Sequence, residues 1–216
     1  MSEYYTVEQG DHLSSIAKDY GFTDYTVIWD HPNNADLKNK RKNPNILLPG
    51  DEIFIPDMEE KNESGATDKR HTFKVDKKPL FLRLVLEDLY EKPIGGAQCA
   101  LRISDEITQP TTTADGKIQQ EIPLDAHDAF LVIRGDETPF ADTLITIKIG
   151  DLDPIDEQSG QIARLNNLGY FAGAIDGSDD SAFESAVEEF QCDHGLTVDG
   201  DCGPKTQAKL KQAHGS

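Results

Sequence analysis

The sequence predicts a multidomain α+β chain, in which a small mixed module, an all-β sandwich and a three-helix module follow one another. The hydrophobic period is two over residues 71–150 and helical from residue 155 onward. A polar stretch over residues 57–70 holds one large apolar side chain, which is too little to offset the entropy of ordering, so it is predicted to be a flexible linker. The modules are therefore expected at residues 1–56, 71–150 and 151–216.

The first module is predicted to run strand, helix, helix, strand. Residues 4–7 are β-prone, and Asp11 occupies the position of a helix N-cap. Residues 26–30 suggest a second helix, and residues 52–56 a closing strand. The first helix follows from apolar residues spaced i, i+3, i+4 and i+7, which are Leu13, Ile16, Ala17 and Tyr20.

Two separated motifs of this module resemble a LysM domain. They are Tyr5-Thr6-Val7-x-x-Gly10-Asp11-x-Leu13-x-x-Ile16-Ala17 and Leu48-Pro49-Gly50-Asp51-x-Ile53-x-Ile55-Pro56, with Asn43-Pro44-Asn45 before the second. An insertion over residues 33–42 makes the module longer than a minimal LysM. Its Asn-Asn-x-x-Leu segment resembles LysM modules attached to phage tails and contractile injection machines.

The LysM resemblance implies recognition of glycans that contain N-acetylglucosamine, in a groove between two loops. Carried over by position, the glycan-binding loops are Gly10, Asp11, His12 and Leu13 on one side and Asn45, Ile46, Leu47 and Leu48 on the other. Fixed backbone groups would meet the sugar hydroxyls, and a small apolar floor the acetyl methyl. Three alternatives stay open: Asp11 caps its helix, Leu13 belongs to the core, or the module docks to protein.

Residues 71–150 are predicted to form a β-sandwich of six or seven strands. Leu80, Leu82, Leu84 and Leu86 share one face of a strand, and Cys99, Leu101 and Ile103 share one face of another, which makes Cys99 a buried structural thiol. The runs over residues 84–88, 93–97 and 111–118 resemble the carboxypeptidase-regulatory or transthyretin-like sandwich. An immunoglobulin-like topology is the alternative. The expected role is that of a spacer or docking platform.

Three helices are predicted after residue 155. Ile162, Leu165 and Leu168 mark the first. The spacing Ser181-x-x-Glu184 indicates a capping box at the start of the second, and Pro204 suits the first position of the third.

The motifs of this last region resemble the three-helix peptidoglycan-binding-domain-like module. They are Ile162-x-x-Leu165-Asn166-x-Leu168-Gly169-Tyr170, Ile175-Asp176-Gly177, Ala186-Val187-x-x-Phe190-Gln191, His194-Gly195-Leu196, Val198-Asp199-Gly200 and Gly203-Pro204-x-Thr206. The resemblance implies glycan contact at Tyr170, Asp176 and Asp199, while local backbone bonding is the alternative for both aspartates. The first half departs from the family pattern, because residues 180–183 stand where Gly-Pro-x-Thr is expected.

No cofactor, metal site or catalytic residue is predicted. Asp176, Asp179 and Asp180 lack the spacing of an EF-hand calcium loop. Cys192, His194 and Cys202 lack a fourth zinc ligand, and the two cysteines either stay reduced or form a disulfide.

Charge and hydropathy limit the partners. The chain carries 40 acidic and 21 basic residues, a net charge of −19, which opposes binding to nucleic acid. One basic patch at Lys38, Lys40, Arg41 and Lys42 is expected to be a solvated loop. No apolar run is long enough for membrane insertion, and residues 1–5 lack the features of a signal peptide, so synthesis in the cytoplasm is expected.

The leading hypothesis is a non-catalytic protein that binds peptidoglycan glycan strands and acts at the cell wall, in the periplasm or in a secreted particle. The alternative is a structural adaptor of a type VI secretion or phage-tail-like particle, which would contact tail spike or baseplate proteins. It is motivated by wall-recognition motifs in a chain without a recognisable signal peptide. A third hypothesis is an accessory subunit that presents a separate amidase or muramidase to its substrate.

Overall fold

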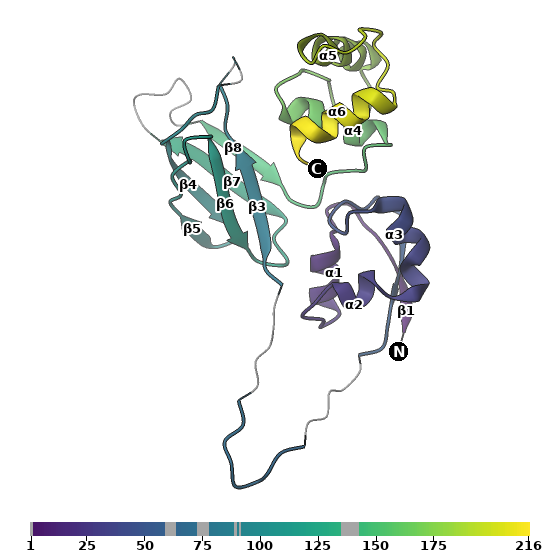
Figure 1. Ribbon diagram of the computed structural model, residues 1–216, viewed down its shortest axis with the longest axis vertical. Coiled ribbons are helices and arrows are strands. Elements are labelled where there is room, and N and C mark those ends of the chain that lie inside the picture. The colour runs from purple at the N-terminus through teal and green to yellow at the C-terminus, as the bar shows by residue number, and fades with distance from the viewer. Residues whose placement is uncertain (1, 59–63, 73–77, 89, 91, 135–142) are drawn as a thin grey trace. The chain divides into compact units, whose positions relative to one another are not determined.

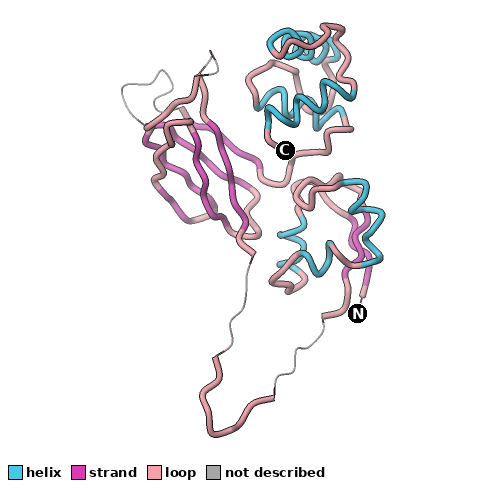
Figure 2. The backbone as a smooth tube through the Cα atoms, viewed as in Figure 1, coloured by secondary structure: helices cyan, strands magenta, loops and turns pink. Residues whose placement is uncertain are grey.

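The computed structural model describes residues 2–58, 64–72, 78–88, 90, 92–134 and 143–216 (Figure 1). It divides into two units, residues 1–150 and residues 151–216. The first unit holds two separate hydrophobic cores and the second holds one. In the described residues, strands occur in the first unit and the second consists of helices and loops (Figure 2).

The N-terminal module contains the predicted two strands and two helices, together with a third helix. Strand β1 (Glu3–Thr6) pairs antiparallel with β2 (Glu52–Ile55). Between them lie α1 (Leu13–Asp19), α2 (Thr26–Trp29), the 3₁₀ turn η1 (Pro32–Asn34) and α3 (Ala35–Arg41). Apolar residues of the strands and of α1 and α2 form the core, including Leu13, Ile28, Trp29 and Ile53.

The expectation of a solvated loop around residues 38–42 is wrong. Three of its four basic residues lie in α3, and Arg41 is buried. The Arg41 guanidinium donates Nε to Asp51 Oδ2 at 2.7 Å and Nη2 to Asp51 Oδ1 at 2.9 Å. Asp51 Oδ2 also accepts the Leu48 N–H, so this pair ties α3 to the turn before β2.

Two further polar residues fix the ends of elements in this module. Asn34 is buried, and its amide bonds to Ile28 O and to both the carbonyl and the N–H of Phe54, which attaches η1 to β2. The N-cap of α1 is His12 and not Asp11, whose carboxylate instead accepts the Tyr5 hydroxyl and the Glu8 N–H. The predicted start of this helix was therefore one residue early.

The sandwich contains six strands in its described part. They are β3 (Leu80–Val85), β4 (Gln98–Ile103), β5 (Glu106–Thr108), β6 (Lys117–Ile122), β7 (Asp128–Arg134) and β8 (Leu144–Lys148). They form a two-stranded sheet, β3-β6, and a four-stranded sheet in the order β5-β4-β7-β8, all antiparallel. Residues of both sheets share one core, in which Cys99 is 2% exposed as predicted.

The second unit has the three predicted helices, α4 (Gln158–Asn167), α5 (Asp180–Asp193) and α6 (Pro204–His214). Ile162, Leu165, Phe190 and Leu210 are fully buried in its core. Pro204 begins α6 as predicted. The capping box at Ser181 is wrong, because α5 begins earlier: Asp179 is its N-cap and accepts the Ala182 N–H at 3.0 Å.

The Arg41–Asp51 pair predicts a pH-dependent N-terminal module. Burial would raise the pKa of Asp51, but the bonds from Arg41 and Leu48 and the charges of Arg41 and Lys40 hold it below its usual value. Because the pKa of Asp51 is lower in the folded state, the pair stabilises the fold at pH values above the unfolded pKa of about 3.9. This stability is lost as the pH falls through the folded pKa. We expect Asp51→Asn to lower the free energy of unfolding by about 3 kcal/mol at pH 7.

Denaturant unfolding followed by the fluorescence of Trp29, the one tryptophan of the chain, checks this prediction in the N-terminal core. The matched control is Asp30→Asn, because Asp30 pairs with Lys38 on the surface and should contribute less than about 1 kcal/mol. Equal losses in the two variants would contradict the role given to the buried pair.

Candidate functional site

Two Asp-Gly turns in the second unit are built alike. In each turn the glycine has a φ of +70°, a conformation that residues with a side chain rarely adopt. Asp176 Oδ1 accepts the Ser178 N–H at 3.0 Å, and Asp199 Oδ1 accepts the Asp201 N–H at 3.0 Å. The alternative of local backbone bonding is confirmed for both aspartates. Hydrogen bonds from Ser178 hold the pKa of Asp176 below its usual value, and bonds from the Gln191 side chain and the Asp201 N–H do the same for Asp199.

The second turn is held by the buried side chain of Gln191, near the end of α5. Its Oε1 accepts the N–H groups of Asp199 at 2.9 Å and Gly200 at 3.1 Å. Its Nε2 lies within hydrogen-bonding distance of Asp199 Oδ1, Asp201 O and Thr206 Oγ1. One amide therefore joins α5, the turn and the first turn of α6.

An exposed apolar residue precedes each Asp-Gly turn. Ile175 is 53% exposed and Val198 is 52% exposed, and Phe171, in the loop that follows α4, is 78% exposed. The predicted contact residue Tyr170 is only 7% exposed, because its ring packs on Phe190 and its hydroxyl donates to Asp193. The exposed large apolar side chains between α4 and α5 are thus Phe171 and Ile175.

A buried arginine supports the start of α4. Arg164 donates Nη1 to the carbonyls of Asp153 at 2.9 Å and Gly160 at 2.6 Å, and Nε to Ser216 O at 3.0 Å. Burial lowers the pKa of Arg164 to about 10, although Asp153 and Asp156 act in the opposite direction. The guanidinium organises the backbone of this unit and is inaccessible to a ligand, since Arg164 is fully buried.

The structure brings the two predicted LysM loops together. The Leu13 N–H donates to Pro44 O at 3.1 Å, which joins the loop after β1 to the loop before β2. The residues of these loops differ in exposure: Asn45 is exposed, Gly10, Asp11 and Leu48 are partly exposed, and His12, Leu13, Ile46 and Leu47 are buried. Leu13 belongs to the core, as one alternative proposed, and of the predicted loop side chains only Asp11, Asn45 and Leu48 are accessible.

His12 acts within the backbone of this loop. Its Nδ1 accepts the Ser15 N–H at 3.3 Å, while Ser15 Oγ accepts the His12 N–H. Burial lowers the pKa of His12, which favours the neutral imidazole that this cap requires. His12 therefore positions α1 and the loop that precedes it.

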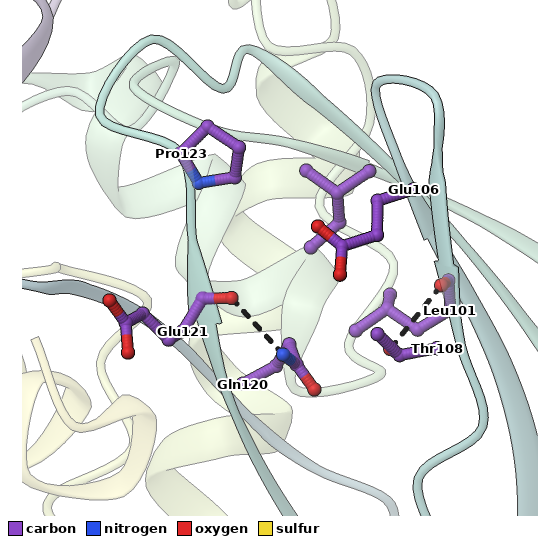
Figure 3. A pocket seen from close by; sticks show the side chains of 7 residues that line it. Leu101, Glu106, Thr108, Gln120, Glu121 and Pro123 are labelled. Carbon is purple, nitrogen blue, oxygen red and sulfur yellow. Dashed lines mark hydrogen bonds between the residues drawn. The ribbon is translucent and has the colours of Figure 1, made fainter.

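The sandwich has a hollow between β6 and the pair β4 and β5. Figure 3 shows the side chains that line it: Leu101, Ile103, Glu106, Thr108, Gln120, Glu121 and Pro123. Its space is about 200 Å³, including the part open to solvent, which is below the size of a typical small-molecule site. It is not a candidate for the main site.

The described residues contain no group of three or more His, Cys, Asp or Glu side chains placed to hold a metal ion. Cys99, Cys192 and Cys202 are free thiols, and burial, with Asp201 second, raises the pKa of Cys202 to about 11. Within the part of the chain that the structure covers, no helix is both long and apolar enough to span a bilayer.

This helical unit matches a known protein family. Residues 163–210 match the family model described as "Putative peptidoglycan binding domain". These residues include α6 through Leu210, α5 and both Asp-Gly turns. The C-terminal unit therefore matches this domain family over residues 163–210.

One relative is similar over a segment of the same length as this family match. The N-acetylmuramoyl-L-alanine amidase CwlM of Mycobacterium tuberculosis (strain ATCC 25618 / H37Rv) is 40% identical over 48 residues, 22% of this chain. The match covers 12% of the length of the amidase, far less than two thirds of it. No solved structure matches the chain.

The sequence motifs include both turns and Gln191, which stands in Ala186-Val187-x-x-Phe190-Gln191, but they give Gln191 no role. Its bonds to the residues around Asp199 and Thr206 appear only when the fold brings these residues together. The prediction of Tyr170 as the contact residue selected the buried one of two neighbouring aromatic residues, because side chains of adjacent residues in an extended loop face opposite ways and Phe171 is the exposed one.

Gln191→Leu is expected to lower the free energy of unfolding of the helical unit by about 2–4 kcal/mol, because the N–H groups of Asp199 and Gly200 lose their acceptor. In this variant, hydrogen exchange of the Asp199 and Gly200 amides should be faster than in the wild type. Its helical ellipticity should also be lost at a lower temperature on heating. In the matched control, Gln207→Leu, one bond to Cys202 O is lost, which should cost about 1 kcal/mol. Unchanged exchange at Asp199 and Gly200 in Gln191→Leu would refute this role.

Proposed function

We propose that this protein is a non-catalytic peptidoglycan-binding protein whose C-terminal unit contacts the wall polymer through the two Asp-Gly turns. The observation that carries the proposal is the peptidoglycan-binding domain at residues 163–210, with Ile175 and Val198 exposed directly before its turns. Exposed aliphatic side chains suit the methyl and acetyl groups of the polymer, and the fixed turn backbone suits its polar groups.

The acidic character of the unit shapes the proposed contact. Residues 151–216 carry 13 acidic and 4 basic residues, a net charge of −9, whereas wall polymers are themselves largely anionic. Long-range attraction to the polymer is therefore not the source of affinity. Close apolar and hydrogen-bonding contacts at the turns are the proposed source, and binding should change little with salt.

A second contact is proposed at the N-terminal module. Its support is the LysM-like sequence pattern and the joining of its two loops by the bond from Leu13 to Pro44. Two weak sites on one chain gain avidity through effective concentration when the intervening segment lets both reach the polymer. Asp11, Asn45 and Leu48 are the side chains proposed to touch N-acetylglucosamine.

The proposal assigns no hydrolytic step to the chain. The similarity to the mycobacterial amidase is confined to 48 residues, in the same region as the peptidoglycan-binding domain. The histidine of the LysM-like loop, His12, is committed to capping α1.

A second candidate function is that of an adaptor in a contractile injection or phage-tail-like particle, docking to a spike or baseplate protein. The specific feature that favours it is α3, which forms in the insertion that resembles tail-associated LysM modules. Co-purification of the full chain with a spike or baseplate protein supports this function. A chain that binds no tail component in the producing cell counts against it.

Co-sedimentation with insoluble peptidoglycan tests the main proposal. We expect the combined variant Phe171→Ser, Ile175→Ser and Val198→Ser to bind about tenfold more weakly than the wild type, since about 1.4 kcal/mol of contact is removed. The matched control, Ile107→Ser with Leu144→Ser, removes residues 63% and 60% exposed on the sandwich and should bind normally.

The contribution of the N-terminal module is read from the same assay. Asn45→Ala is expected to weaken binding by a few fold in the wild type and to abolish the remainder in the C-terminal triple variant. Wild-type binding by the triple variant would overturn the assignment of the Asp-Gly turns. Equal retention on cellulose would overturn peptidoglycan binding itself.

A further inference from the structure

The two sheets of the sandwich differ in width. Strands lie about 4.8 Å apart, so a two-stranded sheet covers roughly half of a four-stranded one. Strand β6 lies over the β4 and β5 side, because Gln120 and Glu121 line the same hollow as Leu101 and Glu106 (Figure 3). Its partner β3 therefore lies toward β8, and both strands are at one margin of the sandwich in Figure 1.

Inward side chains are more buried where the two sheets overlap than at the β3 and β8 margin. Ile118 and Ile122 of β6 and Leu131 of β7 are 6% exposed or less. At the β3 and β8 margin the inward residues are only partly buried, although they belong to the same core: Leu80, Leu82, Leu84, Ile145, Ile147 and Ile149. These six residues, called the open flank below, lack the cover that the remainder of the core has.

Along the same flank, the described part of the chain supplies no strand that pairs with the outer edge of β3. Among the described residues, β3 pairs with β6 alone. The Leu86 N–H donates to Gly116 O, so the backbone groups of Leu86 point toward β6. The N–H and C=O groups of successive residues in a strand point in opposite directions, so those of Phe81, Arg83 and Val85 point to the other edge of β3. Free edges are commonly protected by a proline or an inward charge, whereas β3 carries leucine at its inward positions.

The charge of the flank selects its partner. Lys78, just before β3, pairs with Asp24 at 3.2 Å, so Arg83 is the charge that β3 itself offers to a partner. Arg83 is exposed and lies 5.5 Å from the centroid of the Phe81 ring, on the outward side of β3. A strand added beside β3 would place an outward side chain opposite Arg83, where a carboxylate is favoured.

We propose that the open flank accepts an extended segment of a partner protein as an additional strand beside β3. Its alternate aliphatic side chains would cover Leu82, Leu84 and Ile147, and its other positions would carry carboxylates facing Arg83. The backbone of Phe81, Arg83 and Val85 supplies the hydrogen bonds, and the alternation supplies the specificity. The sandwich is then a protein-docking module, separate from the peptidoglycan-binding unit.

The test uses the full chain and a fluorescein-labelled peptide of about eight residues, in which valine alternates with glutamate and threonine. Fluorescence anisotropy should show saturable binding by the wild type. The same peptide with lysine in place of glutamate should bind at least about tenfold more weakly, because Arg83 then meets a like charge. Absent binding, or equal binding of the two peptides, overturns the proposal.

Two proline variants locate the binding edge. Arg83→Pro removes an N–H that points to the free edge of β3, where an edge strand tolerates proline, and should weaken binding at least about tenfold. Gln119→Pro is the matched control: Gln119 is directly opposite Arg83, and its N–H points to the other edge of the same sheet. Equal loss in both variants overturns the assignment to β3.

A third readout does not depend on the variants folding. In the wild-type chain, the peptide should slow hydrogen exchange of the Phe81, Arg83 and Val85 amides and leave Gln119 and Glu121 unchanged. Protection of the β6 edge instead contradicts the proposal. So does sedimentation that shows the free chain to be a dimer dissociated by Arg83→Pro, because a second copy would then occupy the flank.

Discussion

The C-terminal unit depends on the buried amide of Gln191. The turn at Val198-Asp199-Gly200 lies between α5 and α6, and the N–H groups of Asp199 and Gly200 point to the partly buried side of the turn. One side chain accepts from two of them and donates to the acceptors around Asp199 and Thr206. Without it, the turn that presents Val198 to solvent has no fixed geometry, because an unpaired buried amide costs about 1–3 kcal/mol.

The same solution recurs in each module. In the N-terminal module, Asp51 joins the turn before β2 to Arg41, and Asn34 attaches η1 to β2. In the sandwich, Thr112 accepts the Ala97 N–H and donates to Ile94 O. Each module thus has a modest apolar core and a few buried polar side chains that fix its loops, and the loops carry the proposed contacts.

The sequence was sufficient for features that depend on local periodicity and insufficient for those that depend on distant pairing. Alternation predicted β4 with Cys99 inward, and Pro204 predicted the start of α6, because both signals lie within one element. Helix α3 was missed since its stability relies on Asp51, ten residues beyond Arg41. The predicted N-caps, Asp11 and Ser181, were wrong, because another polar residue stands within two positions of each. The backbone conformation, which the sequence does not give, makes His12 the N-cap of α1 and Asp179 the N-cap of α5.

Contact between peptidoglycan and the Asp-Gly turns of the C-terminal unit can be measured by the amide chemical shifts of the isotope-labelled full chain during titration with soluble muropeptides. We expect saturable shifts at Ile175–Gly177 and Val198–Gly200 with one dissociation constant, and little change on the sandwich strands. Shifts confined to the N-terminal loops or to the sandwich, with both turns silent at saturation, would contradict this contact.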